Sequence, residues 1–163
     1  MFYDGLGSLS SKVRGFEIVS DEYRKHPSID IQLPTRNDDQ SAGYDFYTPV
    51  DITIMPGERC LVWTDIKAYM QEAEVLMLYV RSSIGVKKGV VLSNGTGIID
   101  ASYYKNAIND GCIGISLYNT SEEIVQIQAG DRIAQGVFMQ YLISDDDIVL
   151  GELREGGFGS SGK

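Results

Sequence analysis

The sequence predicts an all-β domain, a compact sandwich or barrel built from many short strands. Apolar residues alternate with polar or small ones at 50–54, 113–117 and 125–127, which is the pattern of half-buried strands. Continuous apolar runs at 60–63 and 75–80 are too short for ordinary helices and suit a buried, pleated surface. Glycine recurs along the whole chain, so the predicted elements are short.

In chain order, the first predicted element is a short helix at 21–25. A small, flexible turn at 41–43 then leads Asp45 into a strand. The alternating strand at 50–54 follows, and the two apolar runs after it are expected to be inner strands because they carry no polar face.

The second half of the chain begins with a helical turn at 84–88, which Ser83 could cap. Asn94 and Gly95, followed by another glycine two residues on, are a strong signal for a β-hairpin. The two later alternating segments are strands, and a turn at 130–131 runs into a last strand.

These elements fit one domain. A chain of 163 residues that is 43% apolar can bury a core of its own. We assign residues 13–151 to the β domain and residues 1–12, which are small, polar and unpatterned, to an N-terminal extension or a cloning remnant. Residues 152–163 form a C-terminal segment rich in glycine and serine, which has little reason to be ordered alone.

The charge balance excludes some partners. With 14 Lys and Arg against 23 Asp and Glu, the net charge is −9, and no lysine-rich stripe is present. We therefore expect no binding of nucleic acid through phosphate attraction. Any phosphate-bearing ligand would need a local group of cations.

Several site classes and compartments are also excluded. The longest apolar stretch, 75–80, has six residues, whereas a spanning helix needs about 20, and the start of the chain carries no apolar signal region. We expect no membrane span and a cytoplasmic protein with Cys60 and Cys112 reduced. His26 is the only histidine, so a multi-histidine metal centre is excluded. Because His26 is predicted to be a solvated loop residue, we also expect no Ser/His/Asp triad.

Five short segments could carry chemistry, although each also has an ordinary structural reading. At 41–46 an aspartate follows a turn, and at 80–89 a strand delivers Arg81 and two serines to the start of a helical turn, where free amides favour an anion. The alternative readings are a capping carboxylate and an arginine paired with a surface acid.

The third segment, 93–103, places a carboxylate and a ring three residues apart after a glycine-rich turn, where main chain can approach a flat ligand closely. The fourth, 130–136, brings Arg132 and Gln135 onto a strand, as ordinary strand chemistry also would. The fifth, 154–162, contains one phenylalanine among glycines and serines, and that ring would gain by stacking on a base.

Taken in order, the motifs AGYD, RSS, NGTGIIDASY, GDRIAQ and GGFGSSG resemble the five motifs of the trimeric dUTP pyrophosphatases, the dUTPases. The resemblance runs from about residue 14 to the end of the chain. It implies a jelly-roll-like fold, a distorted β-barrel or sandwich, that assembles as a homotrimer with each active site built from three subunits. Residues 152–163 would be the C-terminal arm that closes a site.

The implied reaction is hydrolysis of dUTP to dUMP and pyrophosphate by attack of water on the α-phosphate. It keeps uracil out of DNA and supplies dUMP for thymidylate synthesis. Asp100 matches the carboxylate that orients and activates the water, and Gln135 matches its partner at the water and the α-phosphate. Tyr103 matches the ring that packs under deoxyribose and leaves no room for a 2′-hydroxyl.

The remaining implied contacts bind other parts of the nucleotide. The phosphates would be bound by Arg81, Ser82 and Ser83. The uracil would be bound by Asn94 and the main chain of Gly97, Ile98 and Ile99. The arm would add Phe158 as a lid over uracil, with Arg154 and Ser160 near the phosphates.

The resemblance also implies magnesium. A triphosphate brings about four negative charges to a protein that is already acidic, and these must be neutralised locally. The ion would sit mainly on phosphate oxygens and water, with Asp45 contacting it through water.

Three departures from the family pattern stand out. First, Tyr104 and Lys105 replace the usual glycine and are followed by an extra loop at 106–111. Second, the arm is one residue shorter between Arg154 and its glycines. Third, Gly136 replaces a larger apolar residue, and we interpret this last change as local repacking.

Two rivals remain. One is dCTP deaminase, which shares the fold and trimer but needs a glutamate at the base, and none lies between Glu74 and Glu122. The other is a dUTPase-fold protein with an added regulatory role, in which the loop at 106–111 binds another protein.

Overall fold

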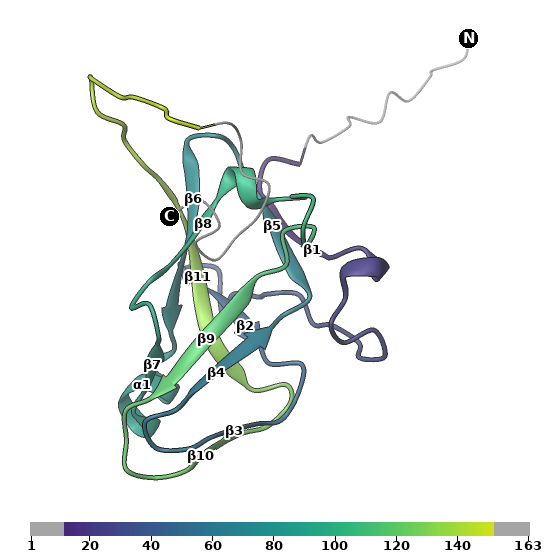
Figure 1. The fold of residues 1–163 in the computed structure, drawn as a ribbon, viewed down its shortest axis with the longest axis vertical. Helices are drawn as coiled ribbons and strands as arrows, with labels where there is room; N and C mark the ends of the chain where they lie inside the picture. The colour runs from purple at the N-terminus through teal and green to yellow at the C-terminus, as the bar shows by residue number, and fades with distance from the viewer. Residues whose placement is uncertain (1–11, 152–163) are drawn as a thin grey trace.

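The computed structural model describes residues 12–151, which form short strands with one α-helix. Figure 1 shows the strands crossing the body of the molecule, with α1 (Ser82–Lys88) beside β7 (Val90–Leu92) at one end and the segment after β11 (Arg132–Gln140) extending away at the other. Within the described part, the strands pair in four small sheets, and no sheet closes on itself. The all-β prediction is confirmed.

The largest sheet has the order β2-β11-β6-β8 and is antiparallel throughout. Its central strand, β6, pairs with β11 on one side and β8 on the other, so Tyr79 lies opposite Gln135 and Val75 lies opposite Asp100. The strands of this sheet besides β11 are β2 (Tyr44–Tyr47), β6 (Glu74–Val80) and β8 (Gly97–Asp100).

The other strands form a three-stranded sheet, β4-β9-β7, and two pairs, β10 with β3 and β1 with β5. All of these pairings are antiparallel. The bounds are β1 (Gly15–Ile18), β3 (Ile52–Ile54), β4 (Arg59–Trp63), β5 (Ile66–Tyr69), β9 (Gly114–Asn119) and β10 (Val125–Ile127).

One apolar core lies between these sheets. The alternation predicted at 113–117 is confirmed, because Ile113, Ile115 and Leu117 are all buried while the residues between them are partly exposed. Phe46 and Leu76 contribute from the largest sheet. This contiguous core supports a single domain.

The helical predictions are partly wrong. The segment at 21–25 is a single 3₁₀ turn, η1 (Asp21–Tyr23). Ser83 does not cap α1, because the helix begins at Ser82, two residues before the predicted start, with Arg81 as its N-cap residue and no side-chain cap. The helix ends at Gly89, whose φ of 65° favours glycine. Among the described residues, no helix has the length and apolar character needed to cross a membrane.

Cys60 and Cys112 are both free within the described residues, and their reduced state stays a prediction. Burial raises the pKa of Cys112 to about 11, and burial also raises the pKa of Cys60. His26 lies in a loop as predicted, but its ring is half-buried and its Nε2 is 3.1 Å from the Trp63 carbonyl oxygen, so it is not a fully solvated residue.

Gly136 is fixed by packing in the middle of β11. A Cβ atom there would lie 2.9 Å from both Leu76 Cδ1 and Phe46 Cε2, and both of those side chains are fully buried. The side chains of Phe46 and Leu76 therefore fill the space that a larger side chain at position 136 would need, which agrees with the local repacking predicted for this glycine.

We predict that Gly136→Leu lowers the free energy of unfolding by about 1–3 kcal/mol, because Phe46 and Leu76 have no space to move into. Urea denaturation monitored by circular dichroism measures this change. Thr53→Val, at an exposed position of β3, is the control and should unfold like the wild type. A Gly136→Leu protein as stable as the control would contradict the packing argument.

Candidate active site

A cavity of about 540 Å³ lies where the chain passes from β7 to β8. It contains six of the residues that the sequence predicted to act together. These are Asn94, Gly97, Ile98, Ile99, Asp100 and Tyr103, and the remaining lining residues are Arg59, Leu78, Leu92, Ser93, Thr96, Gly114 and Ser116.

The predicted hairpin at 94–97 is wrong in one respect, and the difference explains the cavity. The strands on either side of this turn do not pair with each other, because β7 pairs with β9 and β8 pairs with β6. The turn therefore connects two different sheets. The space between those sheets opens beneath it, with Leu78 on one wall and Ser116 on the other.

Short local contacts fix the turn. The Gly95 amide donates to the Leu92 carbonyl at 2.9 Å, and Gly95 has a φ of 74°, where other residues are strained. Gly97 serves close packing, since a Cβ atom there would lie 2.9 Å from Leu78 Cβ. The hydroxyls of Ser93 and Ser116 share a hydrogen bond of 2.8 Å that joins the turn to β9.

Asp100 and Tyr103 occupy the end of this cavity that follows β8. Asp100 is the last residue of β8 and precedes the 3₁₀ turn η2 (Ala101–Tyr103), and its side chain is half-buried. Tyr103 is 6% exposed, and its hydroxyl donates to the Cys112 carbonyl and accepts from Asn109 Nδ2, each at 2.7 Å. Burial raises the pKa of Tyr103, so its phenol stays neutral.

A second polar group lies at the other end of the largest sheet. Asp45, 2% exposed, accepts a 2.5 Å hydrogen bond from Arg81 Nη1 and a 3.3 Å one from Arg132 Nη1. Gln135 is the cross-strand partner of Asp45, and its side chain lies against Gly43. One carboxylate thus faces two guanidinium groups, which leaves positive charge at this end of an acidic protein.

Arg81 pairs with a buried carboxylate here instead of the surface acid of the alternative reading. Ser82 and Ser83 are exposed at the start of α1, next to Arg81. These exposed hydroxyls and the remaining cationic charge can bind phosphate oxygens.

The two polar groups are far apart within one chain. Asp100 lies opposite Val75 of β6. Arg81 follows Val75 by six residues along the direction of β6, which corresponds to about 20 Å at roughly 3.3 Å per residue. Gln135, opposite Tyr79, is four residues or about 13 Å along. A water held by Asp100 is beyond the reach of Gln135 and Arg81 of the same chain.

The metal-binding side chains in this part of the structure fit magnesium only when the substrate and water supply most of its ligands. No group of three or more His, Cys, Asp or Glu side chains able to hold a metal occurs among residues 12–151. Asp45, the predicted water-mediated contact, has one oxygen bonded to each arginine. These residues fit an ion held mainly by substrate phosphates and water.

Some residues of the cavity carried no local sequence signal. Arg59 comes from β4 and lies with its guanidinium 5.4 Å from the centre of the Tyr118 ring, and only the pairing of β4 with β9 brings it here. Ser93 and Thr96 were part of the predicted turn but had no assigned role. Arg154, Phe158 and Ser160 lie outside the described residues.

Comparison with known proteins identifies the family of this chain. A sequence model of the dUTPase family matches residues 30–162. The chain belongs to the dUTPase family. A curated relative from Lactococcus lactis, named deoxyuridine 5′-triphosphate nucleotidohydrolase, is 45% identical over 152 residues, which is 93% of this chain and 99% of that protein. A relative of the same name from Haemophilus influenzae is 36% identical over 82% of this chain and 89% of its own length.

Solved structures agree with the dUTPase-family fold. The crystal structure of a dUTPase from Streptococcus mutans has a TM-score of 0.70 and 42% identity, covering 80% of this chain and 98% of that one. A point mutant of the dUTPase from phage phi11 of S. aureus, described as coordinating a structural Mg(II) ion, has a TM-score of 0.64 over 86% of this chain and 99% of its own. At 23% identity, the phage protein supports the fold alone.

Proposed function

We propose that the protein hydrolyses dUTP to dUMP and pyrophosphate. The observation that carries this proposal is the single cavity that holds Asp100, Tyr103 and the turn at 94–97 together. Its size and the mixture of main-chain, apolar and carboxylate groups suit a nucleoside. The relatives that bear the name of this activity match nearly the whole chain.

In this proposal the nucleoside occupies the cavity. Asn94 and the main chain of Gly97, Ile98 and Ile99 read the edge of uracil, and the Tyr103 ring lies under the deoxyribose. Asp100, at the edge of the same cavity, orients a water and accepts its proton as the water attacks the α-phosphorus. Pyrophosphate then leaves, so catalysis comes from positioning and charge stabilisation without a covalent intermediate.

The phosphates would be bound by groups of a neighbouring chain. Arg81, Ser82, Ser83 and Gln135 lie about 13–20 Å along the sheet from Asp100, so another subunit must supply them to the same nucleotide. This separation supports an oligomer in which each site is assembled from several chains, and the dUTPase motifs make a homotrimer the form that we propose.

The segment after β11 also supports assembly. Five apolar side chains between 142 and 150 are largely exposed, with Leu142 at 97% and Leu150 at 94%. Figure 1 shows this yellow-green segment standing away from the body. Exposed apolar side chains of this number suit contact with another subunit. Arg154, Phe158 and Ser160 follow, and we propose that residues 152–163 close a site of the trimer.

Magnesium is part of the proposal. When bound to the triphosphate, Mg²⁺ would neutralise its charge, with Asp45 near it through water. Arg81 and Arg132 would hold the Asp45 carboxylate in place.

The rival functions are not favoured. The curated relatives are dUTP nucleotidohydrolases rather than deaminases. The polar side chains of the loop at 106–111 bind this chain itself, which gives no support to a partner-binding role for them.

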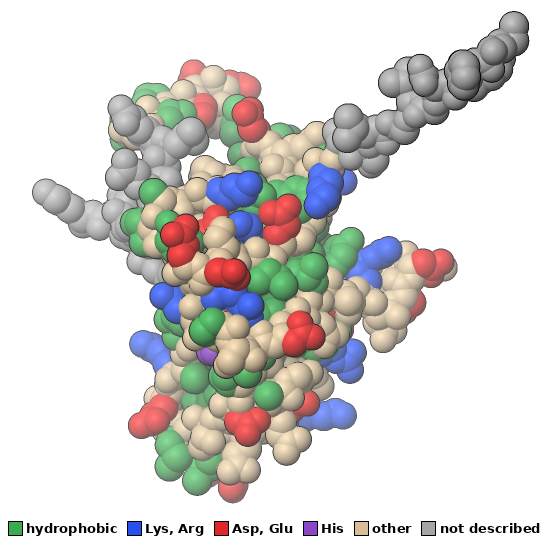
Figure 2. Space-filling model, turned by 90° about the vertical axis from the view of Figure 1, so that its right-hand side faces the viewer, with side chains coloured by type: hydrophobic (Ala, Val, Ile, Leu, Met, Phe, Trp, Pro, Cys, Tyr) green, Lys and Arg blue, Asp and Glu red, His purple; other side chains and the backbone are tan. Residues whose placement is uncertain are grey.

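The face in Figure 2 carries intermixed acidic and basic side chains and no continuous basic surface of the kind that nucleic acid requires. The free cysteines suit a reducing compartment, and a cytoplasmic location stays a prediction.

The decisive assay measures pyrophosphate release from dUTP, dTTP, dCTP and UTP. We expect turnover of dUTP alone, because the turn reads uracil and the Tyr103 ring excludes a 2′-hydroxyl. Ammonia released from dCTP would identify a deaminase instead. Equal turnover of all four nucleotides would contradict the proposed site.

We predict that Asp100→Asn binds dUTP with near wild-type affinity but loses at least about 100-fold in kcat, because the amide keeps the shape and cannot accept the proton of water. Calorimetric titration with a non-hydrolysable dUTP analogue measures the affinity, and pyrophosphate release measures kcat. Asp51→Asn, an exposed carboxylate outside the cavity, is the matched control. Undiminished turnover by Asp100→Asn would refute the assignment.

A mixing experiment tests the composite site. Asp100→Asn and Arg81→Gln proteins should each be nearly inactive alone. Unfolding and refolding them together in equal amounts should restore activity at about a quarter of the sites, where each chain supplies the group that the other lacks. If both groups acted from the same chain, the mixture would stay as inactive as its parents.

A further inference from the structure

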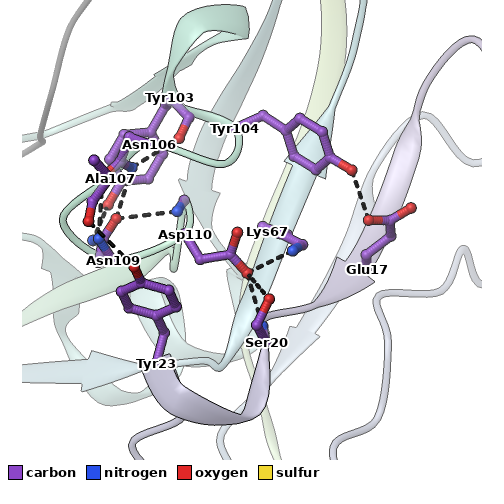
Figure 3. Close-up of polar contacts among 11 residues, drawn as sticks. Glu17, Ser20, Tyr23, Lys67, Tyr103, Tyr104, Asn106, Ala107, Asn109 and Asp110 are labelled. Atoms are coloured by element: carbon purple, nitrogen blue, oxygen red, sulfur yellow. Dashed lines mark hydrogen bonds and ion pairs between the residues drawn. The ribbon is translucent and has the colours of Figure 1, made fainter.

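The loop at 105–111, which the dUTPase motifs leave without a role, is a closed and ordered structure. Asn106 organises it: its Oδ1 accepts from the amides of Ile108 and Asn109 at 3.0 and 3.1 Å, and its Nδ2 donates to the Tyr103 carbonyl at 2.9 Å. The Lys105 amide closes the loop on the Asp110 carbonyl at 3.2 Å. The loop therefore folds back onto Tyr103, as Figure 3 shows.

Asn109 connects this loop to the hydroxyl of Tyr103. Its Nδ2 donates to that hydroxyl at 2.7 Å, while its Oδ1 accepts from Asn106 Nδ2 at 2.7 Å and from the Gly111 amide at 3.1 Å. Because two donors face Oδ1, the amide group can sit in only one orientation, with its donor toward Tyr103. The hydroxyl in turn donates to the Cys112 carbonyl, so the far end of the ring is held on two sides.

The loop is itself anchored to the body of the domain. Asp110, buried, accepts from Lys67 Nζ at 2.5 Å and from the amide and hydroxyl of Ser20 at 2.7 and 2.9 Å. Burial alone would raise the pKa of Asp110, but these hydrogen bonds lower it below its ordinary value, so the ion pair is intact at neutral pH. Gly111 passes so close to Tyr103 that a Cβ atom would lie 2.8 Å from its carbonyl oxygen.

We propose that Asn109 is a positioning residue that sets selection against ribonucleotides by fixing the Tyr103 ring in the sugar subsite. The loop holds the hydroxyl end of the ring, and the η2 turn holds its backbone end. The ring therefore cannot tilt away to admit a 2′-hydroxyl. This inference rests on the proposed hydrolysis of dUTP, and deepens it by naming the residue behind the sugar selectivity.

The experiment is a double-mutant cycle on selectivity. The ratio of kcat/KM for dUTP to kcat/KM for UTP is measured for the wild type, Asn109→Ala, Tyr103→Phe and the double variant. Each single change should lower this ratio by about tenfold, since a small displacement of the ring admits the extra hydroxyl. The double variant should be no worse than the singles, because both remove the same contact.

A second variant separates positioning from folding. Asn109→Asp keeps the acceptor that binds Asn106 and Gly111 but replaces the donor that faces Tyr103 with a second acceptor. The hydroxyl of Tyr103 has one hydrogen, which can then bond either this carboxylate or the Cys112 carbonyl, so the ring is held on one side instead of two. Asn109→Asp should lower the ratio mainly by improving turnover of UTP, with its melting temperature near that of the wild type. Tyr23→Phe is the matched control, because Tyr23 bonds the outer side of the loop, at the Ala107 carbonyl, and should keep the wild-type ratio.

The outcomes are distinguishable. Additive losses in the cycle, or an unchanged ratio in Asn109→Asp, would overturn the positioning role while leaving dUTP hydrolysis in place. If Tyr23→Phe also lowers the ratio of kcat/KM for dUTP to kcat/KM for UTP, the loss of selectivity comes from a general loosening of the loop, and this result would also overturn the positioning role of Asn109. A wild-type protein that fails to prefer dUTP over UTP would overturn the proposed function and this inference together.

Discussion

The antiparallel register of β6 determines the layout of the whole site. This strand holds β8 on one side and β11 on the other, so Asp100 and Gln135 are fixed at different heights along it. Neither can approach the other without breaking the hydrogen bonds of the largest sheet. In the proposed trimer, each chain would therefore keep a fixed arrangement and receive the missing phosphate-binding groups from a neighbouring chain.

The charged groups are divided in the same way between the two ends of the largest sheet. The nucleoside cavity carries a carboxylate, which suits the activation of water but repels phosphate, whereas the opposite end carries Arg81 and Arg132 around one buried carboxylate. In the proposed trimer, the carboxylate and the arginines that act on one nucleotide would come from different chains, so an acidic protein could bind an anion with its repulsive and attractive groups held apart. Asp45 contributes by orienting the two arginines.

The sequence predicted what depends on short stretches of chain. The alternation at 113–117 and the inner strand at 75–80, which is β6, are local patterns and are confirmed, and the six predicted residues between 94 and 103 lie in one cavity. The run at 60–63 was also predicted to be an inner strand, and this was wrong: it is β4, which lies at the edge of its sheet with Leu61 44% exposed. The short strands β1 and β5 were missed, because each has only four residues and β5 contains Lys67.

What could not be predicted depends on contacts between distant segments. Arg59 reaches the cavity through the pairing of β4 with β9, more than fifty residues apart in the chain. The turn at 94–97 has the composition of a hairpin, yet the sheets that its flanking strands join are chosen by tertiary packing. The position of Ser83 inside α1 was likewise decided by where β6 ends, not by its capacity to cap.

The saturated hydroxyl of Tyr103 has a consequence for inhibitor chemistry. Its one hydrogen is given to the Cys112 carbonyl, and an acceptor lone pair is taken by Asn109, so the phenol presents carbon to the cavity. In the proposed complex with dUTP, a sugar analogue would gain nothing there from an added polar group. Substituents at the 2′ carbon would be sorted by their volume, and modified nucleosides aimed at this pocket should be varied in bulk before they are varied in polarity.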